Sequence, residues 1–150
     1  MKKTALISII ILLLTAAACT IEHSENGNLD GMWQLTQLDT LNTSGTTTEH
    51  SADMRTKGIF WSVQHNMLRM SAVYGDAEPV FFRFVHSGDR LTLSNPYTDN
   101  REEGDIKIED PSEFAFYNID ALEQTFYVEK LTSGRMTLRS ERFRFHFRKY

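Results

Sequence analysis

The chain has 150 residues, of which 41% are hydrophobic and 24% charged, and a formal net charge of −4. This length and composition predict one globular domain, because 150 residues leave too little chain for two well-filled cores. The acidic balance excludes a basic field for nucleic acid. The single cysteine excludes a disulfide within the chain.

The N-terminal segment has the features of a secretory signal. Lys2 and Lys3 form a positive start, and residues 5–14 are an apolar run interrupted only by Ser8. The run is well short of the ~20 residues that a transmembrane helix needs. Three alanines follow, directly before Cys19.

The sequence Ala-Ala-Ala-Cys at residues 16–19 resembles the bacterial lipoprotein box. The resemblance implies that residues 1–18 are removed and that Cys19 becomes the lipidated first residue; a plain signal peptide is the alternative. Acyl chains such as palmitate contribute about 0.8 kcal/mol per buried methylene, so several of them would anchor the protein in the cell envelope, which we expect to be the outer membrane. The polar residues 19–28 then predict a flexible tether to the membrane.

The domain of residues 29–150 opens with a predicted strand over residues 29–41. Trp33 and Leu35 fall on one face of it, with polar residues between them. Residues 42–53 are rich in Ser, Thr and Gly without periodicity, which predicts a long surface loop.

Alternating apolar and polar residues then predict a series of hairpins. The expected strands are residues 58–65, 67–74, 79–86, 91–94, 125–131, 135–139 and 143–148. Residues 95–113 carry successive turn signals and predict a second mobile loop, with a short edge strand at 106–108. Residues 114–122 give a short helical signal, with Asn118 or Asp120 as candidate caps.

About eight antiparallel strands with almost no helix predict an all-β, up-and-down barrel with one short helical turn. Closure removes the sheet edges that would otherwise be open to aggregation. An eight-stranded barrel is either filled by side chains or able to hold one small ligand. A five-stranded barrel or a β-sandwich is the structural alternative.

The sequence resembles the lipocalin-like lipoproteins of Bacteroides-type bacteria. The matching stretches are residues 29–35 (LDGMWQL), 60–64 (FWSVQ), 136–140 (MTLRS) and 145–150 (FHFRKY). More distantly it resembles the wider lipocalin group, in which the tryptophan of a Gly-x-Trp motif packs at the closed end of the barrel under a basic residue of the last strand. The resemblance implies that Gly31, Trp33 and Arg148 form this closure, with Lys149 behind Arg148.

The sequence departs from classical lipocalins in having no disulfide and no C-terminal helix after the last strand. Bacterial proteins of this kind are mostly of unknown function, so the resemblance implies an architecture rather than an activity.

The aromatic side chains of the strands are the candidate ligand-binding residues. Adjacent Phe81 and Phe82 must point to opposite faces, so one aromatic face lies inside the barrel. Filling of the core is the simpler explanation. The alternative is an apolar cup lined by Trp61, Phe82, Phe84 and Phe126.

Metal and enzyme sites have weak support. His65, His86 and His146 show no paired ligand spacing, so we expect no metal and no cofactor. The acidic residues of the 99–113 loop lack the spacing of a Ca²⁺ loop and indicate a solvated surface, with weak cation binding as the alternative. No serine has the context of a nucleophile, so we expect a protein that is not an enzyme.

The sequence leaves three candidate functions. The first is a lipid-anchored barrel that binds a small apolar or amphipathic ligand. The second is a filled barrel that serves as an interaction module for an envelope protein or a glycan-handling complex. The third, a hydrolase that uses the acidic loop, would need two carboxylates in one pocket.

Overall fold

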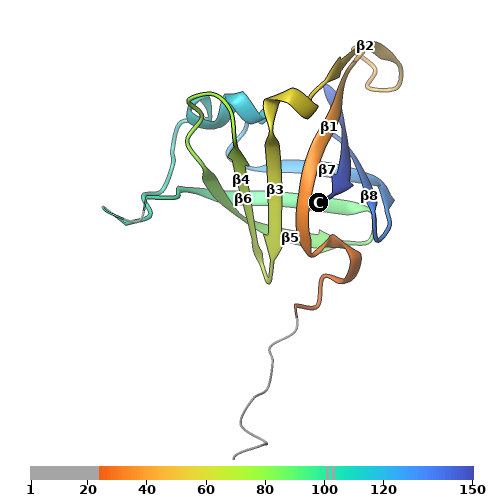
Figure 1. Cartoon of the computed structure of the whole chain (residues 1–150). Helices are drawn as coiled ribbons and strands as arrows, with labels where there is room; N and C mark the ends of the chain where they lie inside the picture. The colour runs from red at the N-terminus through yellow and green to blue at the C-terminus, as the bar shows by residue number, and fades with distance from the viewer. Residues whose placement is uncertain (1–23, 101, 103) are drawn as a thin grey trace, which may run out of the picture.

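The computed structural model describes residues 24–100, 102 and 104–150, and Figure 1 shows them as a barrel of antiparallel strands with short 3₁₀ helices at its ends. The expected signal peptide and Cys19 lie outside the described residues. Within those residues no helix is both long and apolar enough to cross a membrane.

The barrel is closed by eight strands, as the sequence predicts. The sheet order is β2-β1-β3-β4-β5-β6-β7-β8-β9, and β9 also pairs with β1, so β1 and β3 to β9 form the ring. The strands are β1 (Gly31–Leu41), β2 (Thr48–Asp53), β3 (Ile59–Gln64), β4 (Met67–Ala72), β5 (Val80–Ser87), β6 (Arg90–Thr98), β7 (Gln124–Leu131), β8 (Arg135–Arg139) and β9 (Phe143–Lys149).

Strand β1 has three partners because it is long. Residues 31–34 pair with β3, residues 37–41 pair with β2 along the same edge, and the opposite edge pairs with β9. A bulge between Leu35 and Gln37 shifts the β1–β9 register. Extra residues of this kind bend a strand and increase its twist, which helps a sheet to close.

The inward faces of the strands supply the core. Trp33, Trp61, Phe82, Phe126 and Phe145 have no measurable exposure. Aliphatic side chains of β1 and of β3 to β8, together with the phenylalanines of β9, fill the space between these rings, as expected for the alternating pattern of the sequence.

Short 3₁₀ helices lie at the two ends of the barrel (Figure 1). At one end is η1 (Gly27–Leu29), where Leu29 is buried and its carbonyl accepts a hydrogen bond from Trp33 Nε1 at 2.8 Å. At the other end are β2, η2 (Arg55–Lys57) and η3 (Pro111–Tyr117), and η3 buries Phe114 and Tyr117 in the core.

Four predicted segments differ from the structure. Residues 48–53, expected in a loop, form β2, because a strand paired along one edge only can be polar on both faces. Strand β6 runs on through Asn95 and Pro96 to Thr98, where a turn was expected; Asn95 takes a positive φ of 49° beside a register shift.

The helical segment begins earlier than predicted. Asp110, not Asn118 or Asp120, caps the N-terminus of η3 by accepting a hydrogen bond from the Ser112 amide at 2.9 Å. Asn118 instead ends η3 in the left-handed region, with φ of 60°. The expected edge strand at 106–108 is reduced to one bridge between Tyr97 and Lys107.

The described part of the expected tether contacts the barrel. Asn26 Nδ2 donates to the carbonyl oxygen of His65 at 2.6 Å, and the His65 amide donates to Ser24 Oγ at 3.2 Å. Ser24 and Asn26 also donate hydrogen bonds to the Asp30 carboxylate. Residues 24–28 are therefore held against the β3–β4 turn.

Candidate binding groove on the outer wall

The four aromatic residues predicted to line a ligand cup meet inside the barrel, but they fill it. Trp61 and Phe126 pack edge to face with ring centroids 5.8 Å apart, and Phe82 packs against Phe114 of η3 at 5.2 Å. Phe84, the fourth of them, is also buried. None of the four side chains is more than 6% exposed, so protein side chains pack closely around them.

Two polar atoms on inward-facing side chains are nevertheless buried without a partner among the described residues: Trp61 Nε1 and His86 Nε2. The Trp61 ring lies 4.8 Å from the Phe147 ring and 5.9 Å from the Phe145 ring, centroid to centroid. An indole N–H enclosed by rings has lost its bonds to water without gaining a conventional acceptor, which is unfavourable.

The cation that covers Trp33 at the closed end is Lys149, not Arg148 as expected. Lys149 Nζ lies 4.7 Å from the centre of the Trp33 ring and donates to the Asn28 carbonyl at 3.0 Å. Trp33 is the register partner of Lys149, whereas Arg148 pairs with Gln34 and points to the outside of the barrel.

Gly31 makes room for that lysine. A Cβ on Gly31 would meet Lys149 Cε at 3.0 Å, and the φ of Gly31 is +108°, a conformation that other residues rarely adopt. The Gly-x-Trp opening therefore has a structural explanation at this end of the barrel.

A groove of about 600 Å³ crosses the outer wall of the barrel. Its floor is the outer face of β1, β9 and β8, and the strand order places β2 and η2 on one side of the floor and β7 on the other. The polar side chains that line it are Thr36, Gln37, Ser51, Asp53, Arg55, Lys130, Arg135, Thr137, His146 and Arg148.

The groove is cationic although the chain as a whole is acidic. Asp53 is the one carboxylate among its lining residues, and the Arg55 guanidinium bonded to it lowers the pKa of Asp53 to about 2. Within the described residues no hydrogen bond or ion pair reaches the side chains of Lys130 or Arg135, and Arg148 bonds to the uncharged Gln34 at 3.1 Å. The groove is thus suited to an anion.

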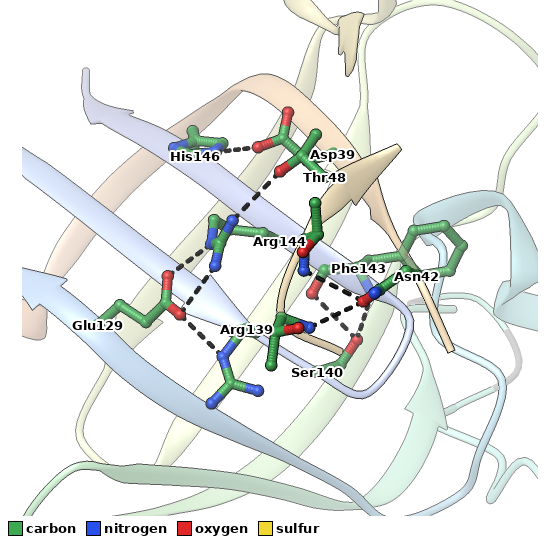
Figure 2. A network of polar contacts seen from close by, with 11 residues as sticks. Asp39, Asn42, Thr48, Glu129, Arg139, Ser140, Phe143, Arg144 and His146 are labelled. Atoms are coloured by element: carbon green, nitrogen blue, oxygen red, sulfur yellow. Dashed lines mark hydrogen bonds and ion pairs between the residues drawn. The ribbon is translucent and has the colours of Figure 1, made fainter. Parts of the chain in front are cut away.

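A network of ion pairs and hydrogen bonds extends from the groove along β9 (Figure 2). His146 Nε2 lies 2.8 Å from Asp39 Oδ2, and Asp39 also accepts from Ser51 Oγ at 2.6 Å and Gln37 Nε2 at 2.7 Å. Burial raises the pKa of Asp39, but these three hydrogen bonds outweigh burial, so the pKa lies below its usual value.

Farther along the same wall, Glu129 joins two arginines (Figure 2). It accepts from Arg139 Nε at 2.8 Å and from Arg144 Nε at 2.6 Å. Burial raises the pKa of Glu129, and the two guanidinium groups lower it by more.

The other candidate residues do not converge. No group of three or more metal-binding side chains occurs in the described part of the chain. In the acidic loop Asp99 pairs with Arg69 at 2.7 Å and Asp110 caps η3, so these two carboxylates have structural partners.

The groove was not predicted from the sequence, because the predictions rested on the apolar face of the last strands. The polar face carries its own signal: Arg135, Thr137 and Arg139 alternate on β8, and Arg144, His146 and Arg148 alternate on β9. Pairing these two strands in a hairpin brings the six side chains to one outer face.

Comparisons with known proteins agree with the architecture. The profile of the lipocalin-like domain family matches residues 12–150. Among curated proteins none matches the sequence.

Two solved structures share the fold. A lipocalin-like protein from Bacteroides uniformis has 21% sequence identity and a TM-score of 0.57, over 83% of this chain and 100% of that one. An uncharacterized protein from Bacteroides eggerthii has 21% identity and a TM-score of 0.52, over 81% of this chain and 98% of that one. With its closed eight-stranded barrel and a family match over nearly its whole length, the chain belongs to the lipocalin-like domain family.

Proposed function

We propose that this protein is a non-enzymatic binding module of the bacterial cell envelope, anchored through a lipidated Cys19, whose filled barrel holds a partner on its outer wall. The observation that carries the proposal is the cationic groove of about 600 Å³, in which Lys130 and Arg135 have no partner among the described residues. The inner face, by contrast, is occupied by packed aromatic rings.

The anchor is consistent with the geometry of the closed end. Ser24 is held against the β3–β4 turn, and Cys19 precedes it closely in the sequence. Because each residue spans at most ~3.6 Å, a lipid on Cys19 would lie within about 18 Å of this turn. The barrel would then stand next to the membrane with η1 toward it and η3 away from it.

Site-specific photocrosslinking in the native host tests the role of the outer wall. A photoreactive amino acid at Thr137, on the floor of the groove, should give a defined crosslinked product. The same amino acid at Val85, an exposed outward residue of β5, should not. Equal yields at the two positions, or no product at Thr137, would contradict the proposal.

The anchor is tested separately by Cys19→Ser. The wild-type protein should incorporate a palmitate analogue and sediment with membranes, and the variant should do neither. A variant that is still labelled and still sediments would show that Cys19 is not the anchor.

The second candidate function is the binding of a small apolar or amphipathic ligand inside the barrel, and the unpartnered Trp61 Nε1 favours it. A ligand with a carbonyl or hydroxyl oxygen could accept this hydrogen bond if it displaced the aromatic rings that pack around Trp61. Native mass spectrometry of the protein extracted in mild detergent tests this candidate. A bound small molecule that is lost in Trp61→Phe would support it, and ligand-free protein would oppose it.

A further inference from the structure

The outer face of the β8–β9 hairpin carries two pairs of arginines. Arg139 is the register partner of Arg144, and Arg135 is the register partner of Arg148. The pairs are four residues apart on both strands. Because this spacing is even, both pairs project from the same face of the sheet and are antiparallel pairs of the same type. Like charges placed directly opposite each other on a sheet are destabilising unless an anion separates them.

The first pair has such an anion. Glu129, from the neighbouring β7, accepts hydrogen bonds from Arg139 Nε at 2.8 Å and from Arg144 Nε and Nη2 at 2.6 and 3.3 Å. One carboxylate thus bridges two guanidinium groups across the hairpin, as Figure 2 shows. Planar two-point contacts of this kind are the strongest that arginine makes with a carboxylate.

The second pair has no carboxylate among the described residues. Beside this pair β7 supplies Lys130, whose register partner is Thr137, so the neighbouring strand adds a third cation. Arg148 bonds to Gln34, and nothing described bonds to the Arg135 side chain. The groove lies over this pair and therefore presents three cations without a carboxylate between them.

We propose that the groove binds an acidic sugar, with its uronate carboxylate between Arg135 and Arg148 as the carboxylate of Glu129 lies between Arg139 and Arg144. This inference rests on the proposed role of the outer wall and names the chemistry of the partner. Hydroxyl and amide groups of Thr36, Thr137 and Gln37 line the groove beside the arginines and can bond to sugar hydroxyls.

The shape of the groove favours a sugar over an acidic peptide. An extended peptide that binds to a sheet adds to an exposed strand edge and uses its unpaired N–H and C=O groups. The floor of this groove consists of the faces of β1, β9 and β8, which are already paired with one another. What it offers a ligand is a set of side chains, and these are mostly polar.

Calorimetric titration of the protein with tri-galacturonic acid tests the inference. Saturable binding is expected, weakening with salt, and neutral tri-galactose should not bind. Arg135→Gln should weaken binding about tenfold or more, because it removes a charged two-point contact. Arg83→Gln makes the same change in charge on β5, outside the groove, and should alter the affinity less than about twofold.

Lys130→Glu supplies a competing carboxylate from the chain itself. It should abolish binding of the trisaccharide while raising the melting temperature, whereas Lys130→Gln should only weaken binding. The melting curve of Lys130→Glu shows whether the variant is folded, so that a loss of binding is not mistaken for unfolding.

Four results would overturn the inference: no binding of tri-galacturonic acid, equal binding of the neutral trisaccharide, equal losses in Arg135→Gln and Arg83→Gln, or tighter binding of an oligo-glutamate peptide of the same charge. In the last case the outer wall remains a binding surface, for an acidic peptide. The role of the outer wall itself is tested by the crosslink at Thr137, and it fails if that product is missing or if the yield at Val85 is equal.

Discussion

Asp39 on β1 and His146 on β9 join the first and last strands of the barrel on its outer wall, with 2.8 Å between Asp39 Oδ2 and His146 Nε2. Asp39 is only 5% exposed and accepts two further hydrogen bonds from neighbouring side chains. Asp39 is thus a buried carboxylate whose partners come from the two strands that close the barrel, β1 and β9, and from β2.

We expect Asp39→Asn to lower the free energy of unfolding at neutral pH by about 1–3 kcal/mol, the range for losing hydrogen bonds to a buried charged group. The pKa of Asp39 is depressed in the folded state below its ordinary value of 3.8. Its contribution is therefore complete above that value and is lost as the pH falls through the folded-state pKa. Urea unfolding at neutral pH and at about pH 3 should show the two proteins converging in acid.

The matched control is Asp76→Asn, which removes an exposed carboxylate on the β4–β5 loop. It should change stability by less than about 0.5 kcal/mol at either pH. If the wild-type protein remains as much more stable than Asp39→Asn at about pH 3 as it is at neutral pH, the stabilisation does not come from the ionised Asp39 carboxylate.

Lys149→Ala should destabilise the protein by about 1–2 kcal/mol, because it removes the cation that lies over the Trp33 ring and the hydrogen bond that Lys149 Nζ donates to the Asn28 carbonyl. Arg148→Ala, one residue earlier, should cost less than about 0.5 kcal/mol, because its side chain is exposed on the outer face. Denaturant melts followed by tryptophan fluorescence measure both. The reverse order of effects would mean that Arg148 closes the barrel.

Phe114→Ala should cost about 3–5 kcal/mol, since it leaves a cavity where the ring packs against Phe82. Phe116→Ala is the control on the same 3₁₀ helix, where the ring is 40% exposed, and should cost under about 1 kcal/mol. Thermal unfolding compares the two. Similar small losses in both variants would show that η3 does not fill the end of the barrel and would favour a ligand site there.

Glu129→Gln should lower stability by about 1 kcal/mol, because it leaves Arg139 and Arg144 opposite each other without their bridging carboxylate. The arginine pair, left without a negative charge between its members, should also bind tri-galacturonic acid, so the calorimetric stoichiometry should rise above that of the wild type. An unchanged stoichiometry would show that a bare arginine pair on this sheet is not enough to bind a uronate.

Period-two patterning was sufficient to predict the ring of strands, because inward apolar residues alternate in all of them. It was insufficient for β2, whose residues are exposed or half-buried along most of the strand and carry no apolar face. Pairing with the long β1, a tertiary effect, makes this segment a strand.

A cation over Trp33 was predicted, but the predicted residue was Arg148 and the structure has Lys149 there. A basic residue at the end of the last strand was expected beside the first, yet Arg148 and Lys149 point to opposite faces. The alternation along β9 already puts Lys149 on the inward face of Phe145 and Phe147. The β1–β9 pairing, which depends on the closure of the barrel, then sets Lys149 opposite Trp33. The groove, likewise, depends on four strands coming together around β9.

An amide and indole NMR titration with tri-galacturonic acid tests most directly whether a partner binds the outer wall or the interior. The chain has two tryptophans, and both are buried, so their indole N–H signals report on the core. We predict that the backbone amide signals of Thr137 and His146 shift while the indole signal of Trp61 stays in place. A shift of the Trp61 indole signal with the Thr137 and His146 amides unmoved would contradict binding on the outer wall and place the ligand inside the barrel.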